Sequence, residues 1–442
     1  MARIAIIGTG ISGLGAAYLL HPRHEITVYE KAARIGGHTR TMNVRYGDAT
    51  IPVDTGFIVF NQRNYPHLTA MFRHLGVPVH QSEMTFAATI NGGWLEWGAK
   101  NLNAVFGQRR NMLRPRFHLL VRDVMRFNSL AMETVERRPR LTLGELIGHL
   151  KLGEWFKHYY ILPMAGAIWS CPPREMLSFP ALAFVRFFAN HGLLSVSGQP
   201  QWYTVTGGAQ TYVDRLTASF AHRIRTGCGA TRVMREDGKV CVSDTTGNSE
   251  TYDEVVFACH GNEARALLGD ANALESELLG AFRYQANRAV LHKDVSMMPK
   301  RQACWASWVY HADGSAAEPA ISVSYWMNSL QGIDRRYPLF VTLNPSREIA
   351  PEHVFDEHTF EHPVFNEAAI AAQSQLRAGQ GSRNTWFCGA HLGHGFHEDG
   401  LRSAVEVAEG LGAPIPWRLP ERRPAESGRQ PLQWAPTPAV AD

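Results

Sequence analysis

The sequence predicts an α/β protein organised around a parallel β-sheet. Two motifs near opposite ends of the chain predict this fold, because each is an apolar run that leads through glycines into a helical pattern, at residues 4–20 and 385–406. The composition agrees, since 45% of the 442 residues are apolar and 19% are charged. This is the profile of a globular chain with room for roughly two or three domains.

The first motif has the three parts of a nucleotide-binding βα unit in the required order. Residues 4–7 are typical of a buried parallel strand, G-T-G-I-S-G follows, and residues 14–20 continue as a helix. The glycines of G-x-G-x-x-G permit a tight turn, close approach of the backbone to a pyrophosphate, and close packing of helix on strand. The residues that this motif contributes to the predicted site are Gly8, Gly10, Ile11, Ser12 and Gly13.

A second predicted strand, residues 25–29, ends at Glu30. An acid about twenty residues after the glycines is where a carboxylate accepts hydrogen bonds from an adenosine ribose. Strand, turn, helix and acid together favour a Rossmann-like nucleotide domain over the alternative, a glycine-rich turn in an unrelated α/β protein.

The segment after Glu30 narrows the choice of nucleotide. Gly36 and Gly37 let a second backbone loop approach the phosphates, and the guanidinium of Arg34 offsets their charge. This E-x-x-x-R-x-G-G stretch, followed by V-D-T-G-F at 53–57, resembles the FAD-dependent amine oxidase and phytoene desaturase superfamily. The resemblance implies FAD as the cofactor and adds to the predicted site Lys31, Arg34, Gly36, Gly37, His38, Thr39, Gly56 and Phe57.

The same resemblance implies further pieces of the cofactor site. The segment 230–233 resembles the strand whose valine backbone meets the adenine, here Val233. The strand at 385–388 ends at Gly389 and leads to a helix similar to the closing flavin motif. In that motif the amides of Gly400 and Leu401 would face the pyrimidine edge of the flavin.

Two positions in the closing motif leave alternatives open. Asp399 would either contact the cofactor or cap the helix that it begins. Ala390 stands where many relatives have an acid that holds the ribityl chain, so that contact would fall to the backbone or to another residue.

The implied organisation is a discontinuous, GR2-type FAD-binding domain with an α+β substrate-binding domain inserted into it. The FAD domain takes 1–60, 203–268 and 380–412, and the substrate domain takes 61–202 and 269–379. The remaining residues, 413–442, are rich in proline and lack periodicity, which predicts a flexible tail.

The densest group of titratable residues is His394, His397, Glu398 and Asp399. A metal site would need these ligands to converge on one point, and a position beside the flavin explains the polar groups better, so we predict no metal. If a proton must leave the substrate, His397 and Glu398 are the candidate catalytic bases.

The substrate prediction rests on aromatic residues and on a second resemblance. The stretches 60–200 and 270–370 are rich in tryptophan, tyrosine and phenylalanine, which suits an apolar substrate, although core packing explains any single ring. G-F-H-E-D-G-L, with N-R-A-V-L-H at 287–292 and W-A-S-W at 305–308, resembles a bacterial branch of FAD-dependent oxidoreductases associated with cyclopropane and methyl-branched or furan fatty-acid modification. The resemblance implies desaturation of a fatty-acyl lipid by hydride transfer to flavin N5.

Two alternatives stay open. A flavin amine oxidase typically has a lysine on a strand in the second half of the chain, but the comparable strand has Asn287 and Arg288, with Lys293 only at its end. The other alternative is a non-redox FAD-binding scaffold for a lipid methyltransferase.

The remaining expectations concern partners and location. The basic, partly apolar stretch 108–127 suits either an anionic bilayer or a solvated helix face. A net charge of +4 gives no reason to expect nucleic acid. The scattered cysteines and the lack of a targeting signal predict a cytoplasmic protein, with peripheral contact at the inner face of the membrane as an option.

Overall fold

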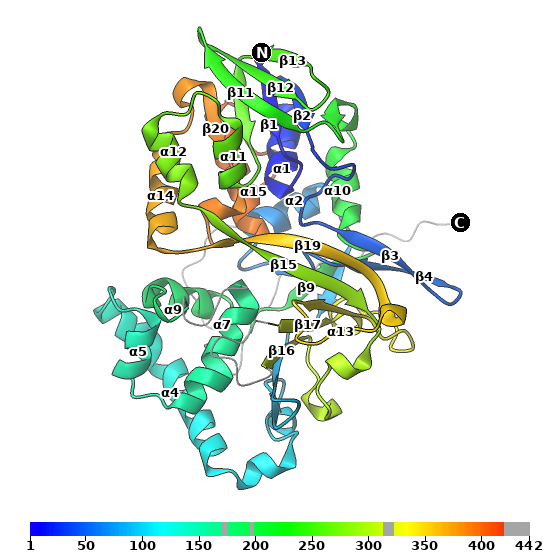
Figure 1. Ribbon diagram of the computed structural model, residues 1–442, viewed down its shortest axis with the longest axis vertical. Coiled ribbons are helices and arrows are strands. Elements are labelled where there is room, and N and C mark those ends of the chain that lie inside the picture. Colours follow the sequence, from blue (N-terminus) through cyan, green and yellow to red (C-terminus); the bar gives the residue numbers. More distant parts are fainter. Residues whose placement is uncertain (170–175, 195–198, 313–321, 420–442) are drawn as a thin grey trace.

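The computed structural model describes residues 1–169, 176–194, 199–312 and 322–419. The molecule is elongated: its upper half in Figure 1 holds the N-terminus and a parallel sheet, and its lower half holds a helical region beside a second sheet. The long strands β15 (Arg283–His292) and β19 (Val354–Val364) run across the middle between the two halves.

Five short strands form the parallel sheet in the order β10-β2-β1-β14-β20, and all of their pairings are parallel. They come from three separate stretches of chain: β1 (Arg3–Ile7) and β2 (Glu25–Tyr29), β10 (Ile224–Arg225) and β14 (Glu254–Phe257), and β20 (Thr385–Phe387). The predicted α/β fold, with a parallel sheet assembled from separated pieces of the chain, is therefore confirmed.

Both faces of this sheet are covered, because alternate residues of β1 point to opposite sides. Ile4 and Ile6 join a core with α1 (Ile11–Leu20) and α15 (His397–Gly410), whereas Ala5 and Ile7 join the core of the other face. The first face also holds α2 (Pro66–His74) and α10 (Gln210–Thr217); the other holds β11 (Ala230–Glu236), β12 (Lys239–Asp244), β13 (Ser249–Tyr252), α11 (Gly261–Leu267), α12 (Ala273–Gly280) and α14 (Glu367–Ala378).

The second sheet has seven strands in the order β19-β15-β18-β17-β16-β7-β8. Its pairings are antiparallel except for β16 with β7. The remaining strands of this sheet are β7 (Phe86–Ile90), β8 (Leu95–Gly98), β16 (Trp308–Ala312), β17 (Ser322–Trp326) and β18 (Phe340–Leu343).

The helical region packs on one face of that sheet around a core of phenylalanines, which includes Phe117, Phe127 and Phe184. Its elements are α3 (Leu102–Val105), the 3₁₀ turn Arg109–Leu113, α4 (Pro115–Arg137), α5 (Leu143–His149), α6 (Glu154–Phe156), the π-turn Lys157–Ile161, α7 (Leu162–Trp169) and α9 (Ala181–Asn190). Smaller pieces elsewhere are β3 (Thr41–Tyr46), β4 (Ala49–Asp54), β5 (Phe60–Asn61), β6 (Val79–Ser82), β9 (Trp202–Val205) and α13 (Met327–Leu330).

The domain boundaries expected at 60, 268 and 380 fall inside packed regions. Leu68 and Phe72 of α2 lie in the core around α1, and Leu279 of α12 and Leu376 of α14 lie in the core of the other face. These segments were expected in the substrate domain, but they cover the parallel sheet, because their apolar faces complete its two layers.

The expectation of a flexible tail is wrong for its first residues, because Ala413 and Trp417 are buried in the core around α1. The Trp417 ring stacks on Tyr18 at 6.5 Å between centroids. Residues 420–442 of the predicted tail lie outside the described part. Among the described helices, none is both long and apolar enough to cross a membrane.

Candidate functional site

The glycine turn between β1 and α1 leaves open space in front of the helix. Gly8 has a φ of 107° and its amide donates to the carbonyl of Tyr29 at 2.8 Å. A Cβ on Gly13 would lie 1.9 Å from the carbonyl oxygen of Gly8, so the helix packs there only without a side chain. A Cβ on Gly10 would meet nothing within 4 Å. Gly10 therefore faces a space at the N-terminus of α1, as a phosphate site requires.

A second glycine loop closes on the first. A Cβ on Gly37 would lie 3.0 Å from the Cα of Gly10, and the amide of Gly36 donates to the carbonyl of Thr9 at 3.0 Å. The guanidinium of Arg34 donates to the carbonyl of Gly37 at 2.8 Å, so in this structure it braces the loop. The two loops together form a cradle of backbone amides, which we call the phosphate cradle.

The carboxylate of Glu30 lies at the edge of this cradle. Its oxygens accept from the amides of Thr9 at 3.0 Å and Ala32 at 2.8 Å, and Glu30 is 9% exposed. A carboxylate has about four acceptor sites, so capacity for a ribose hydroxyl remains. The neighbouring Lys31 forms an ion pair with Glu263.

Gly56 and Phe57 hold the strand after the cradle against His38. A Cβ on Gly56 would lie 2.0 Å from the carbonyl oxygen of His38, and the amide of Phe57 donates to the same carbonyl at 2.9 Å. Three of the predicted site residues therefore form one backbone contact.

The N-termini of α15 and α1 converge on the same region. A Cβ on Gly400 would lie 2.8 Å from Oγ of Ser12 and 2.9 Å from Cγ2 of Ile11. Leu401 is fully buried, and its Cδ1 would lie 2.8 Å from a Cβ on Gly15. Gly400 therefore permits the close approach that brings both helix dipoles to one site.

β20 connects to α15 through Gly389. The amide of Gly389 donates to the Ser403 hydroxyl at 2.9 Å, which ties the end of the strand to the helix. The amide of Gly395 donates to the carbonyl of Ala390 at 3.1 Å, so the Ala390 carbonyl closes the turn.

The structure bears on two predictions for the start of α15: the role of the Gly400 amide and the role of the Asp399 carboxylate. The amide of Gly400 donates to the carbonyl of Phe396 at 3.1 Å, so it is used inside the helix and is not a donor to the flavin. The helical amides without intrahelical partners are those of the first turn. Asp399 accepts from the amides of His394 at 3.0 Å and Phe396 at 3.1 Å, and from Arg402 at 2.8 Å. Of the two roles left open for Asp399, the observed one is helix capping.

Glu398 caps a different helix. Its carboxylate accepts from the amides of His67 at 2.9 Å and Leu68 at 3.0 Å, at the N-terminus of α2. Burial raises the pKa of Glu398 to about 8, against the opposing effect of those two amides. Both oxygens are occupied by backbone, so the structure assigns Glu398 the role of joining α15 to α2 and gives no support to its role as a base.

His397 lies in a compact polar cluster. Its Nε2 lies 2.9 Å from the Tyr212 hydroxyl and 3.0 Å from Oγ1 of Thr39, and its ring stacks on Phe57 at 3.9 Å. Burial lowers the pKa of His397 to about 3, so the ring is neutral at neutral pH. Tyr212 thus contacts three predicted site residues, Thr39, Phe57 and His397, although no sequence motif marked Tyr212 as part of the site.

Val233, predicted to meet the adenine through its backbone, is not the residue that pairs with Glu30. Its side chain is buried in the core of the second face, and its carbonyl accepts from the amide of Gly269 at 2.9 Å. Cys228 is the residue that pairs with Glu30, because its amide donates to the Glu30 carbonyl at 2.9 Å. Between Cys228 and Val233, the pairing of β11 with β12 has an irregularity at Ala230–Arg232. The predicted contact of the Val233 backbone with the adenine stays a prediction.

Three histidines gather behind the second glycine loop. The ring centroid of His38 lies 5.4 Å from His362 and 6.2 Å from His260. Asn287 of β15 is fully buried and its Nδ2 lies 3.0 Å from Nδ1 of His362. Burial, with His260, lowers the pKa of His362 to about 4, so the cluster is largely neutral.

Buried polar atoms without a protein partner concentrate in the segment that follows Phe60. Within the described part of the chain, five such atoms fall in this one segment: Asn61 Nδ2, Gln62 Nε2, Asn64 Nδ2, His67 Nδ1 and Thr69 Oγ1. Unsatisfied buried donors are costly in a finished protein, so a polar ligand or water is expected to meet them. Glu398 ties this segment to the start of α15.

The cradle, the ribose acid and the converging helices define a dinucleotide-binding flavoprotein. Residues 11–290 match the family model of flavin-containing amine oxidoreductases, and the chain belongs to this family. It is an FAD-dependent oxidoreductase, and the predicted FAD cofactor and the resemblance to the FAD-dependent amine oxidase superfamily are confirmed.

Solved structures share the fold at low sequence identity. The CLA-producing fatty acid isomerase from P. acnes is 16% identical, with a TM-score of 0.66 over 93% of this chain and 98% of that chain. Cyclohexylamine oxidase from Brevibacterium oxydans IH-35A is 15% identical, with a TM-score of 0.62 over 93% and 99%. A putrescine oxidase bound to putrescine is 13% identical, with a TM-score of 0.64 over 93% and 99%. Comparison with curated protein sequences gives no match.

The residues present fit FAD. The space at Gly10 and the two converging helix N-termini suit the pyrophosphate, and Glu30 suits the ribose. When bound, the flavin supplies a two-electron acceptor for substrate oxidation. The individual cofactor contacts remain predictions.

Proposed function

We propose that the protein uses FAD to dehydrogenate a hydrophobic acyl substrate. The observation that carries the proposal is a continuous row of rings from the start of α15 into the helical region. Phe396 stacks on Phe187 of α9 at 5.1 Å, and Phe187 stacks on His191 at 3.8 Å. The ring centroid of Trp202 lies 6.3 Å from that of His191 and 6.5 Å from that of Tyr65.

The row is apolar and uncharged. Burial lowers the pKa of His191 to about 4, so this ring is neutral at neutral pH. Rings of this kind suit an acyl chain and exclude water from it.

β15 supports the same choice. The strand has no lysine, and Asn287 stands buried on it, while Arg288 pairs with Glu357 at 2.6 Å on the exposed side. Lys293 follows the strand and lies over the rings of Tyr46 and Phe355, 5.9 Å from each. A lysine-dependent amine oxidation therefore has no candidate on β15.

In this proposal, the protein aligns the substrate with the flavin and excludes water from it. Phe187 and Phe396 come from the two halves of the molecule, so the row fixes how an acyl chain would lie relative to α15. A small displacement of the reacting carbon costs much of the rate, because the chemistry depends on alignment. Dehydrogenation removes a hydride and a proton from neighbouring carbons: the bound flavin would accept the hydride at N5, and the proton would pass to the reduced flavin or to water, which leaves one double bond in the substrate.

The test is anaerobic mixing of the FAD-loaded protein with acyl lipids and with amines, monitored by flavin absorbance. Bleaching by an acyl lipid supports the proposal, and Phe187→Leu is expected to slow it about tenfold or more. Phe282→Leu, a buried phenylalanine on the other face of the parallel sheet, is the matched control. Bleaching by amines with peroxide release on aeration would instead identify an amine oxidase.

Absence of bleaching by any lipid or amine would favour a non-redox role. A stable complex with a lipid methyltransferase would then identify a scaffold. Either outcome would overturn the proposed reaction, while FAD binding itself would stand.

A further inference from the structure

The exposed apolar side chains of this protein concentrate in one region. Seven of the eleven exposed large apolar residues of the described chain lie between residues 94 and 130, so the distribution is not the scatter usual for a soluble surface. They are Trp94, Leu102, Met112, Leu113, Leu119, Met125 and Leu130. We call this region the tip surface; it covers the end of β7–β8, α3, the following 3₁₀ turn and the first part of α4.

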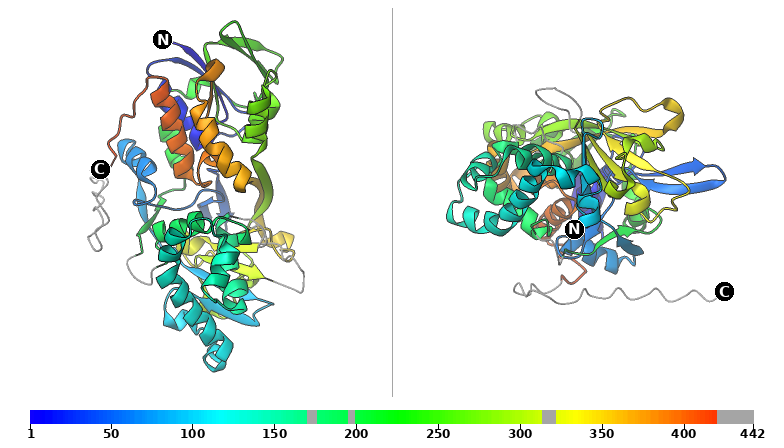
Figure 2. Two further views of the ribbon diagram at one scale, coloured as in Figure 1. Left: turned by 90° about the vertical axis from the view of Figure 1, so that its left-hand side faces the viewer. Right: turned by 90° about the horizontal axis from the view of Figure 1, so that it is seen from below.

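The tip surface lies at one end of the molecule. The cyan residues after β8 form the lower end in Figure 1 and in the left view of Figure 2, away from the N-terminus. The most exposed side chains are Leu113, at 86%, and Leu102, at 77%. They stand near the turn that joins α3 to α4, where a flat partner could reach them.

The tip surface is also strongly basic. Between residues 97 and 132 there is one acid, Asp123, against Lys100 and six arginines. Asp123 is 2% exposed and accepts from the amide of Gly153 at 2.8 Å, so it points into the fold. Within the described residues, no ion pair joins a carboxylate to Arg109, Arg110, Arg114, Arg116 or Arg126.

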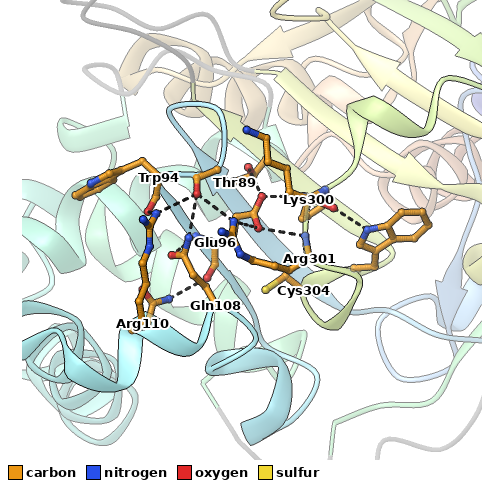
Figure 3. A network of polar contacts seen from close by, with 12 residues as sticks. Thr89, Trp94, Glu96, Gln108, Arg110, Lys300, Arg301 and Cys304 are labelled. Carbon is orange, nitrogen blue, oxygen red and sulfur yellow. Dashed lines mark hydrogen bonds and ion pairs between the residues drawn. The ribbon is translucent and has the colours of Figure 1, made fainter.

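A network of hydrogen bonds around Glu96 anchors the tip surface to its neighbours (Figure 3). The fully buried carboxylate of Glu96 accepts from the amide of Lys300 at 2.8 Å and from the guanidinium of Arg301 at 2.9 Å. Gln108 accepts from the amide of Glu96 and donates to the carbonyl of Gly93 at 2.9 Å. Arg110 also donates to the backbone of this turn. The turn before α4 is therefore fixed to the seven-stranded sheet.

Trp94 completes an interfacial pattern. Its ring lies 5.6 Å from Trp155 and 5.9 Å from Tyr159, and the Arg114 guanidinium lies 5.0 Å above it. This arrangement places tryptophan and tyrosine rings beside an arginine and close to exposed leucines. It suits the boundary between lipid headgroups and acyl chains.

We propose that the tip surface docks on an anionic lipid bilayer. The leucines and methionines would enter the acyl boundary, and the arginines would meet the lipid phosphates. Charge complementarity favours this occupant over a second copy of the chain, since two tip surfaces would bring their arginines together. The proposal does not depend on the reaction catalysed.

The test is co-sedimentation of the FAD-loaded full chain with phosphatidylcholine vesicles, with and without phosphatidylglycerol. Binding is expected only with phosphatidylglycerol, and it should weaken as salt is raised. Arg116→Glu is expected to weaken binding about tenfold, and Leu113→Ser to weaken it severalfold.

Matched controls separate the tip surface from general charge and hydropathy. Arg45→Glu, on the exposed β3 strand, and Leu274→Ser, at an exposed position of α12, should bind like the parent protein. FAD content and Tm should be unchanged in all four variants, because each position is exposed. No binding to anionic vesicles, binding that Arg116→Glu and Leu113→Ser leave intact, or a dimer that Leu113→Ser dissociates would overturn the proposal.

Discussion

The phosphate cradle and the tip surface are opposite in how their residues act. In the cradle, backbone atoms face the ligand space and side chains are excluded. At Gly13, for example, a Cβ would lie only 1.9 Å from the carbonyl oxygen of Gly8. On the tip surface, side chains stand out of the fold, as Leu113 does at 86% exposure. Binding by backbone shape restricts the sequence to glycine, whereas binding by exposed side chains leaves a pattern shared with any amphipathic helix.

The largest expected effect breaks the cradle. Gly13→Ala should abolish FAD retention and destabilise the fold by about 3 kcal/mol or more, because its Cβ would overlap the Gly8 carbonyl. Gly10→Ala is the matched control, since its Cβ meets nothing in the protein; the apoprotein should keep its Tm while FAD affinity falls. FAD content after gel filtration and thermal unfolding of the apoproteins measure both effects. A Gly13→Ala protein that retained FAD fully would contradict the geometry.

The next effect tests the anchor of the tip surface. Glu96→Ala removes the acceptor of Arg301 and of two backbone amides, and is expected to cost about 3 kcal/mol in urea unfolding. The exposed pair of Glu133 with Arg137 is the control, and Glu133→Ala should cost less than about 1 kcal/mol. FAD content should be unchanged by both. An equal cost for the two variants would mean that the buried network contributes no more than a surface pair.

A smaller effect is expected where the two sides of the cofactor site join. Glu398→Ala uncaps α2 and should cost about 1–2 kcal/mol in the apoprotein. Glu406→Ala, on an exposed position of the same helix, should cost little. If Glu398 were instead a catalytic base, the variant would lose flavin reduction with no loss of stability, so unfolding and single-turnover reduction must be measured together.

The last effect vanishes at neutral pH and grows only as the pH falls. Burial, with His260, lowers the pKa of His391 to about 3, so the unfolded chain takes up a proton below about pH 6.5 and the folded chain does not. Stability from this residue is therefore present above pH 6.5 and is lost as the pH falls toward 3, at up to about 1.4 kcal/mol per pH unit. His391→Gln should flatten the dependence of unfolding free energy on pH between 7 and 5. An unchanged slope would show that His391 does not titrate differently on folding.

Local sequence motifs were sufficient to predict the glycine turn and the acid of the cofactor site. Gly8, Gly10 and Gly13 stand within one turn, and Glu30 follows at the end of the next strand, so their roles depend on backbone geometry over a short stretch. The same reasoning offered capping as one of two roles for Asp399, because a helix N-terminus needs an acceptor nearby, and the structure shows the capping contact.

Other roles depended on contacts between distant parts of the chain. Glu398 caps α2 across more than three hundred residues, and Tyr212 meets His397 across nearly two hundred. The backbone contact of Val233 with the adenine stays a prediction; the structure adds that Cys228, five residues earlier in the sequence, pairs with Glu30.

The sequence by itself determined the nucleotide fold, the FAD cofactor and the discontinuous parallel sheet, because glycine turns and buried strands impose local rules. Only the tertiary structure decided which helix Glu398 caps, which amides α15 uses internally, and which side of α4 is exposed. Those depend on how distant segments pack, and packing energy is shared among many residues without a fixed spacing.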